Sequence, residues 1–258
     1  MEKLKVLLLG PTGRIGKYFI EDYFTHKYKN DYNLILGMRN PDKLKGKGYE
    51  IKVADITDFE SLMSAFQGID VVLNLAGNAN EKTQEFKELI EPNIIGTFNV
   101  LEAARLNGVK RVIMASSVHA VKGHDNEKVV SEIDARRPES LYGASKAFIE
   151  AMCHVYYKKY GMSCLAIRIG AYISDDMHEI LLTRENNDYV ISQKDMAQLL
   201  HKAIIAPGTL KYAVLSGTSN NKKKRLSLEY TKELIGYEPE DDSYEMLEQV
   251  KKKGIKTK

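Results

Sequence analysis

Short hydrophobic runs alternate with amphipathic segments along the first 170 residues of the chain. Most of the runs are rich in Val, Ile and Leu, which is typical of strands buried on both faces of a sheet. The segments between them carry helix signals, such as Asp58 at the start of a helix through Phe66. This alternation predicts an α/β fold with a doubly wound parallel sheet. The predicted strands cover residues 4–9, 33–37, 49–54, 71–77, 111–115 and 164–169.

The alternation becomes less regular after residue 170. We expect a loop over residues 171–188, a helix capped by Ser192 that runs through Ile205, a strand over 212–216 and a helix over 226–235 that stops at Gly236. We therefore divide the chain into a core, residues 1–170, and a loop with a small C-terminal lobe, residues 171–258. Residues 189–216 of the second part return to the core.

Composition limits the kinds of function. The formal charge of +3 comes from 38 basic and 35 acidic residues spread along the chain, so no nucleic-acid surface is expected. The two cysteines, Cys153 and Cys164, suggest neither a disulfide framework nor a metal site. No hydrophobic segment approaches the roughly 18 residues of a membrane span, and the first strand begins almost at Met1. The sequence predicts a cytoplasmic protein without a membrane partner.

A glycine-rich turn follows the first predicted strand and opens the first helix. Gly10 permits the tight turn, Gly13 lets the backbone approach a pyrophosphate, and Gly16 allows the helix to pack on the strand. The N-terminus of the helix then faces the phosphates. Because the motif lies directly after a buried strand, we interpret residues 1–170 as a dinucleotide-binding Rossmann core.

The end of the second strand distinguishes between the two nicotinamide cofactors. An acidic residue there would hold the ribose 2′-hydroxyl of NAD, whereas an arginine accommodates the 2′-phosphate of NADP. This chain has Arg39 and no acid, with Arg14 as a candidate second cation. We favour NADP slightly; the alternative is that Arg39 is a solvated loop residue and NAD binds without the acid.

Two further positions have open roles. Asp55, at the end of the third strand, either accepts a hydrogen bond from adenine or stabilises a turn. Asn93 lies in a helix that is otherwise hydrophobic, where it is either a local backbone partner or part of a buried polar network. The small residues Ala76 and Gly77 end the fourth strand and let a cofactor pass close to the backbone.

Candidate catalytic residues follow the fifth strand. Ligands of open α/β sheets bind outside the carboxyl ends of the strands, which is where Ser117 and His119 fall. Tyr142 and Lys146 are four residues apart on a predicted helix and share one face. We expect Ser117 to orient a substrate oxygen, Tyr142 to transfer its proton, and the Lys146 charge to lower the tyrosine pKa. His119 is either a substrate ligand or an ordinary loop histidine.

These motifs together resemble the extended short-chain dehydrogenase/reductase family, also called the NAD-dependent epimerase/dehydratase family, over nearly the whole chain. The segments 93–96, 115–119, 141–146 and 168–170 are most similar to uronate dehydrogenases. The resemblance implies a triad of Ser117, Tyr142 and Lys146 that oxidises the anomeric hydroxyl of a sugar. With the patterns above, it implies substrate contacts from Ser117, Val118, His119, Tyr142 and Ala171. It implies cofactor contacts from Gly10, Thr12, Gly13, Arg14, Ile15, Gly16, Arg39, Asp55, Ile56, Leu75, Ala76, Gly77, Asn93, Tyr142, Lys146 and Ile169.

The chain also departs from the uronate dehydrogenase pattern. Ala171 and Ile180 stand near the positions of a serine and an arginine that grip the substrate carboxylate in those enzymes, and Val118 replaces an asparagine. These differences favour a substrate without a carboxylate. The alternative is that a different polar residue, Arg184, binds the substrate. The short C-terminal lobe favours a small substrate over a nucleotide-activated sugar.

We therefore predict an NAD(P)-dependent oxidoreductase of a small sugar or sugar derivative, with residues 171–188 as the substrate loop. Two alternatives are an epimerase or dehydratase that keeps NAD tightly bound, and a non-catalytic cofactor sensor. Hydrophobic positions on two long helices, Phe98, Leu101, Phe148 and Met152, predict a homodimer. The alternative is that they pack only on their own sheet.

Overall fold

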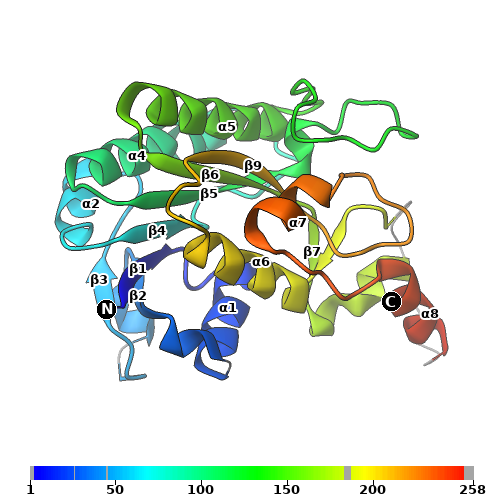
Figure 1. Cartoon of the computed structure of the whole chain (residues 1–258), viewed down its shortest axis with the longest axis horizontal. Coiled ribbons are helices and arrows are strands. Elements are labelled where there is room, and N and C mark those ends of the chain that lie inside the picture. Colours follow the sequence, from blue (N-terminus) through cyan, green and yellow to red (C-terminus); the bar gives the residue numbers. More distant parts are fainter. Residues whose placement is uncertain (1–2, 26, 45, 183–186, 253–258) are drawn as a thin grey trace.

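A single parallel sheet between two layers of helices dominates the computed structural model, which describes residues 3–25, 27–44, 46–182 and 187–252 (Figure 1). All neighbouring strands of this sheet are parallel, in the order β3-β2-β1-β4-β5-β6-β9. The predicted doubly wound α/β fold is confirmed. The strands are β1 (Leu4–Leu9), β2 (Tyr32–Met38), β3 (Ile51–Val53), β4 (Val71–Asn74), β5 (Arg111–Ser117), β6 (Ser163–Ile169) and β9 (Tyr212–Gly217).

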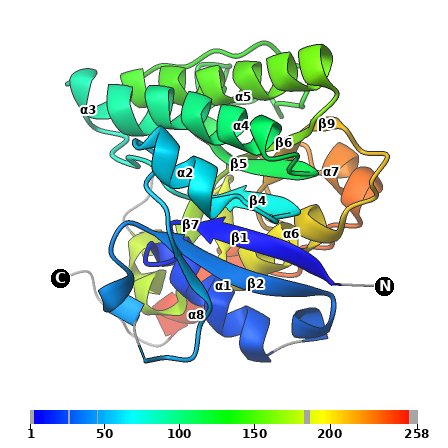
Figure 2. The same ribbon diagram turned by 90° about the vertical axis from the view of Figure 1, so that its left-hand side faces the viewer.

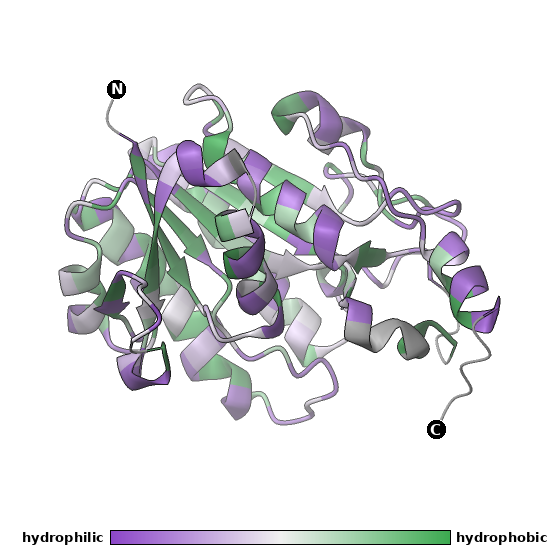
Figure 3. Cartoon of the chain, turned by 90° about the horizontal axis from the view of Figure 1, so that it is seen from below, coloured by the Kyte–Doolittle hydropathy of each residue, from purple (hydrophilic) through white to green (hydrophobic). Residues whose placement is uncertain are grey.

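Helices cover both faces of the sheet. Figures 1 and 2 show α2 (Phe59–Ala65), α4 (Gly96–Leu106) and α5 (Leu141–Tyr160) on one face, and α1 (Arg14–Thr25) and α6 (Gln193–Ile205) on the other. Two clusters of buried hydrophobic residues fill the two interfaces. The strands are largely hydrophobic, whereas the outer sides of the helices carry most polar residues (Figure 3). This distribution is expected when a parallel sheet is buried on both sides.

The short elements complete the chain. A second, two-stranded sheet, β7 (Ala171–Ile173) and β8 (Val190–Ser192), lies beside the C-terminal helices (Figure 1). The division into a core and a lobe stays a prediction. The remaining segments are η1 (Lys27–Asn30), η2 (Pro41–Leu44), α3 (Lys87–Leu89), η3 (Ile90–Ile95), η4 (Val118–Ala120), η5 (Asp175–Leu182), α7 (Glu229–Ile235) and α8 (Ser243–Lys252).

Some element boundaries differ from the sequence prediction. The third strand is only three residues long, and α7 begins at Glu229 because Leu226 forms a parallel bridge with Val130. Asp58 and Ser192 cap their helices as predicted, each accepting a hydrogen bond from a backbone N–H in the first turn. Of the hydrophobic residues expected to face a second subunit, Leu101 is fully buried against its own sheet and Met152 packs on the same cluster.

The order of the strands determines where a ligand can bind. The chain adds strands in one direction from β1 and in the opposite direction from β4, so the helices that follow these two strands lie on opposite faces of the sheet. A crevice therefore forms at the carboxyl ends of β1 and β4. None of the helices in the described ranges has the length and hydrophobicity needed to cross a bilayer.

Candidate active site

Two adjoining cavities open at the carboxyl ends of the strands. We call them the Gly10 cavity, of about 490 Å³, and the Tyr142 cavity, of about 400 Å³. Each is within the usual size range of small-molecule sites. They share a wall formed by the segment after β4, namely Leu75, Ala76, Gly77 and Asn78.

The glycine turn forms the floor of the Gly10 cavity. Gly10 has a φ of +84°, and a Cβ there would lie 2.9 Å from the backbone N of Ala76. A Cβ on Gly16 would lie 2.4 Å from the carbonyl oxygen of Gly10, so the helix packs directly on the turn. Helix α1 begins at Arg14, directly after Thr12 and Gly13, which line this cavity. The first backbone N–H groups of a helix have no acceptor within the helix. This cradle fits the pyrophosphate of a dinucleotide.

Arg39 and Asp55 line the Gly10 cavity, together with Thr12, Gly13 and Ile56. The Asp55 carboxylate accepts hydrogen bonds from the backbone N and the hydroxyl of Thr57, at 2.9 and 2.8 Å. Asp55 therefore stabilises the turn after β3 and also faces the cavity. Arg39 follows β2 with no carboxylate before it, as the sequence indicated.

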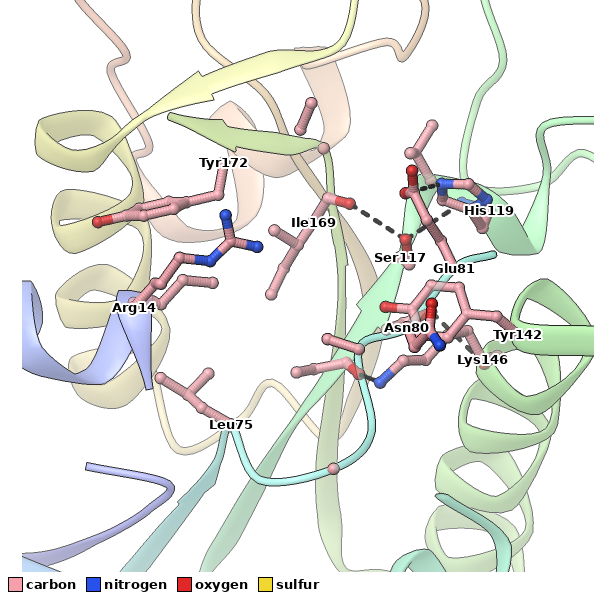
Figure 4. A pocket seen from close by; sticks show the side chains of 18 of the residues that line it. Arg14, Leu75, Asn80, Glu81, Ser117, His119, Tyr142, Lys146, Ile169 and Tyr172 are labelled. Carbon is pink, nitrogen blue, oxygen red and sulfur yellow. Dashed lines mark hydrogen bonds and ion pairs between the residues drawn. The ribbon is translucent and has the colours of Figure 1, made fainter. Parts of the chain in front are cut away.

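Arg14 and Arg39, the two candidate cations for a 2′-phosphate, line different cavities. Arg14 lines the Tyr142 cavity with Ile15, whereas Arg39 lines the Gly10 cavity. Figure 4 shows the Arg14 guanidinium beside the ring of Tyr172, on the opposite side of the cavity from His119. A joint role of Arg14 and Arg39 in binding a 2′-phosphate therefore stays a prediction.

Ser117, Tyr142 and Lys146 meet in the Tyr142 cavity (Figure 4). Ser117 ends β5, and its Oγ accepts a hydrogen bond from the His119 backbone N at 3.2 Å. Ser140 caps α5 by accepting from the Gly143 N at 3.0 Å, which begins the helix just before Tyr142. Tyr142 and Lys146 are only 8% and 6% exposed. Two elements far apart in sequence therefore present their functional groups to one small space.

Burial controls the protonation of these groups. It raises the pKa of Tyr142 to about 12, although the Ser117 hydroxyl opposes this shift and the Glu81 charge adds to it. Burial also lowers the pKa of the Lys146 ammonium to about 8. The expectation that the Lys146 charge lowers the pKa of Tyr142 is wrong, because burial raises this pKa. The Lys146 Nζ donates a hydrogen bond to the Ala115 carbonyl at 2.9 Å and lies 5.4 Å from the centre of the Tyr142 ring.

Asn93 belongs to a buried polar network, the second of its two predicted roles. It is 2% exposed in the π-helical segment η3. Its Oδ1 accepts from the Asn78 N at 2.8 Å, and its Nδ2 donates to the Asn78 carbonyl and to the Ser145 Oγ. Asn93 lines neither cavity and supports the shared wall through Asn78, so its expected contact with the cofactor stays a prediction.

The sequence patterns missed several residues of the Tyr142 cavity. Glu81 is the most notable, because its Oε2 lies 2.8 Å from the His119 Nε2. No motif distinguished it, since its segment has no regular structure and its partner lies 38 positions later. Val118, Ala171 and Ile169 line the cavity, and their contacts with substrate or cofactor stay predictions. Arg184 lies outside the described residues. Tyr172, Ile173 and Ile180 line the cavity from the segment expected to form the substrate loop. Other lining residues that were not predicted are Asn78, Ala79, Asn80, Lys82, Lys122 and Tyr189.

Comparison with known proteins gives consistent results. Residues 6–193 match the model of the NAD dependent epimerase/dehydratase family. A uronate dehydrogenase from Pseudomonas syringae pv. tomato is 30% identical over 242 residues, which is 93% of this chain and 82% of the relative. An L-arabinose 1-dehydrogenase (NAD(P)(+)) from Haloferax volcanii is 30% identical over 78% of this chain and 86% of its own.

Solved structures agree with the sequence comparison. The crystal structure of a mutant uronate dehydrogenase from Agrobacterium tumefaciens complexed with NAD superposes with a TM-score of 0.82 at 25% identity. The match covers 99% of this chain and 92% of that one. The overall architecture of this chain is therefore shared with a protein that binds a nicotinamide dinucleotide.

Proposed function

Since the chain belongs to the NAD dependent epimerase/dehydratase family, we propose that it is an NAD(P)-dependent dehydrogenase of a small sugar or sugar derivative. The observation that carries this proposal is the meeting of Ser117, Tyr142 and Lys146 in a cavity that adjoins the glycine turn. The relatives named above are dehydrogenases of uronates and of L-arabinose, which supports a sugar carbinol as the reacting group.

In this proposal each of the three residues has its own role. The Ser117 hydroxyl holds the substrate oxygen beside the Tyr142 phenol, and the deprotonated Tyr142 oxygen accepts the hydroxyl proton. Lys146 is close to the tyrosine ring and supplies a positive charge that favours the phenolate once the site is filled. A bound nicotinamide would supply the hydride acceptor for the carbon that carries this hydroxyl group, which would balance the loss of the proton.

The cofactor is held by the Gly10 cavity in this proposal. The N–H groups that open α1 and the turn from Gly10 to Gly16 bind the pyrophosphate, and Asp55 and Ile56 line the adenosine end. We infer that NADP is accepted at least as well as NAD, because Arg39 lies where an acidic residue would otherwise bind the ribose. Gly77 and Ala76 let the dinucleotide pass from one cavity to the other.

The substrate is small in this proposal. A space of about 400 Å³ receives both the nicotinamide end of the cofactor and the substrate, which leaves room for one unactivated sugar ring. Val118, His119 and Ala171 lie around this position. A nucleotide-diphosphate sugar would need further space beside the second sheet, where η5 and α8 already pack on each other.

We also propose that two copies of the chain pair through α4 and α5, which lie side by side on one face of the molecule (Figure 2). Exposed hydrophobic residues recur there at helical spacing. Ile95, the last residue of η3 before α4, and Phe98 of α4 are 45% and 46% exposed, and Leu141 and Val155 of α5 are 38% and 46% exposed. Such stripes are unusual on a face that stays in water, and an isologous pairing of the two helices would cover them.

A substrate panel tests the proposed function. Aldoses, uronic acids and sugar phosphates are offered to the purified protein with NAD or NADP, and reduced cofactor is followed by its absorbance. We expect turnover with at least one small sugar. Absence of reduction with every sugar, combined with NAD that copurifies with the protein, would favour an epimerase or dehydratase instead.

A further inference from the structure

The C-terminal helix α8 packs behind one wall of the Tyr142 cavity. This wall consists of Tyr172 and Ile173 of β7, Ile180 of η5, and Tyr189, which directly precedes β8. We call these four residues the Tyr172 wall. Helix α8 contacts both η5 and β8, at the same end of the molecule as β7 (Figure 1). The Tyr172 wall therefore lies between the cavity and the C-terminal helix.

Hydrophobic packing joins α8 to the Tyr172 wall. Ile173 and Leu181 are each 1% exposed and belong to a small cluster of buried hydrophobic residues. Met246 and Leu247 of α8 pack against this cluster. Leu181 also follows Ile180, which lines the cavity. Because protein interiors are close-packed, loss of a side chain from α8 would leave space into which the wall can move.

Hydrogen bonds join the first residues of α8 to the segment that precedes Tyr189. The fully buried Ser243 hydroxyl donates to the Asn187 carbonyl oxygen at 2.8 Å. The Tyr244 hydroxyl donates to the Asp188 carboxylate. Burial and this carboxylate raise the pKa of Tyr244 to about 12, so the phenol keeps its proton at neutral pH. Two consecutive residues before the wall are thus held by α8.

Asn221, in the loop after β9, strengthens the same connection. It is fully buried, and its Oδ1 accepts a hydrogen bond from the Ser243 N at 3.0 Å. Its Nδ2 donates to the carbonyl oxygens of Val190 and Asp188, at 2.9 and 3.3 Å. One side chain therefore fixes the start of α8 relative to the start of β8.

The backbone of Tyr189 lies directly against the segment after β6. Its carbonyl oxygen accepts a hydrogen bond from the Ala171 N at 2.8 Å, and a Cβ on Gly170 would lie only 2.0 Å from this oxygen. Gly170 follows Ile169, which lines the cavity at the end of β6. Because Asp188 directly precedes Tyr189, the contacts of α8 with Asp188 help to fix the distance between the wall and the end of β6.

The Tyr172 wall limits the space for a substrate. Figure 4 shows Tyr172 on the opposite side of the cavity from His119 and Tyr142. A substrate whose reacting carbon lies at Tyr142 therefore extends toward this wall. A second sugar ring would have to displace the wall toward α8, where Leu181 and Leu247 belong to one packed cluster.

We propose that α8 determines the size of the substrate: it holds the Tyr172 wall in place, through Leu247 and Tyr244, and so restricts the site to a single sugar ring. This inference rests on the proposed sugar dehydrogenase function and extends it to substrate size. Leu247 and Tyr244 are positioning residues, because neither lines the cavity and both act through the segments that do.

The test compares the best aldose with the reducing disaccharide that carries the same aldose at its reducing end, so both offer the same anomeric hydroxyl. We expect wild type to prefer the aldose in kcat/KM. This preference should fall roughly tenfold in Leu247→Ala, which removes packing behind the wall, and less in Tyr244→Phe. Glu248→Gln is the matched control, because Glu248 is an exposed residue of the same helix that pairs with Lys251.

Two readouts separate positioning from general destabilisation. The KM for the disaccharide should fall in Leu247→Ala, while kcat for the aldose and the affinity for reduced cofactor stay nearly unchanged. A loss of folded protein would instead lower kcat for both sugars alike and leave the preference unchanged. If Leu247→Ala does not fold, the double variant Ser243→Ala with Tyr244→Phe carries the test, because it removes hydrogen bonds and little hydrophobic volume.

Two outcomes would overturn the proposal: a wild type that oxidises both sugars equally well, or a preference that stays unchanged in the folded variants. Failure of the proposed function is recognised separately. If wild type oxidises no sugar, both sugars are titrated into its complex with reduced cofactor, and binding is followed by cofactor fluorescence. The aldose should bind more tightly in wild type, and the difference should shrink in Leu247→Ala. Equal affinities, or no binding of either sugar, would contradict the role of α8.

Discussion

The guanidinium of Arg168 donates two hydrogen bonds to the Glu150 carboxylate, at 2.9 and 3.0 Å, and both residues are fully buried. Ser116 donates to the same carboxylate at 2.9 Å, and Arg136 approaches it at 3.0 Å. Glu150 lies one helical turn after Lys146, Ser116 precedes Ser117, and Arg168 precedes Ile169. The ion pair therefore joins the helix and the two strands that carry the candidate site.

Removing one partner of this pair should be costly. We expect Glu150→Ala to lower the free energy of unfolding by about 3–5 kcal/mol, because Arg168 is left buried without a countercharge. The double variant Glu150→Met with Arg168→Met should be less destabilised, since no charge then remains in the interior. Urea unfolding followed by circular dichroism measures both. Equal destabilisation of single and double variants would contradict this explanation.

Lys146 should contribute activity at the expense of stability. Its folded pKa of about 8 lies below the ordinary value of 10.5. Below pH 8 the lysine is protonated in both the folded and the unfolded protein, so burial of its charge lowers the free energy of unfolding by the full amount. Between about pH 8 and 10.5 the lysine is neutral in the folded protein and still protonated in the unfolded protein, so this destabilisation decreases as the pH rises.

We therefore expect Lys146→Met to raise the free energy of unfolding at pH 7 by roughly 1–3 kcal/mol. This gain should shrink as the pH approaches 10.5, while activity is lost at all pH values. Urea titrations at pH 7 and pH 10 provide the measurement. A variant that is less stable than wild type at pH 7 would show that the hydrogen bond to Ala115 outweighs the buried charge.

Arg39 should determine the cofactor preference. Replacing it with Gln removes a charge-assisted hydrogen bond worth about 1.5–3 kcal/mol, so NADP affinity should fall roughly 10-fold to 100-fold while NAD affinity changes little. Fluorescence titrations with both reduced cofactors measure this. The control is Arg14→Gln, which alters a cation outside the Gly10 cavity. Equal losses for both cofactors would exclude a specific role in binding the 2′-phosphate.

Phe98 should be central to pairing of two chains. Phe98→Lys places a charge in the exposed hydrophobic stripe of α4 and should convert a dimer into a monomer without loss of folding, since the side chain is 46% exposed in the single chain. Light scattering after size-exclusion chromatography gives the mass. Ile133→Lys, at a position 88% exposed on another segment, is the control. A wild-type monomer would refute the proposed interface.

The features that the sequence predicted well depend on local physics. A buried hydrophobic run followed by Gly10, Gly13 and Gly16 has few alternatives, because the close backbone approach at Gly10 and Gly16 excludes a Cβ. The spacing of Tyr142 and Lys146 places both on one helix face wherever that helix lies. Strand order then follows from alternation of strands and helices, so the position of Ser117 was predictable from its place after β5.

The features that the sequence missed depend on three-dimensional contacts. Glu81 has no local pattern, and it becomes recognisable only when β4 and β5 pair and bring its segment to His119. The pKa of Tyr142 also could not be inferred from its neighbour Lys146 alone, because burial exceeds the effect of any nearby charge. The direction of the Arg14 side chain could not be predicted for the same reason, because Arg14 lines the Tyr142 cavity beyond the turn.

The central claim is that Tyr142 is the acid/base of a nicotinamide enzyme, and Tyr142→Phe tests it most directly. Turnover of the best sugar should fall by about 10²-fold to 10⁴-fold, while the affinity for reduced cofactor stays within about twofold of wild type. Tyr189→Phe, another tyrosine of the same cavity, serves as the control. A Tyr142→Phe protein that retains most of its turnover would contradict the proposed mechanism.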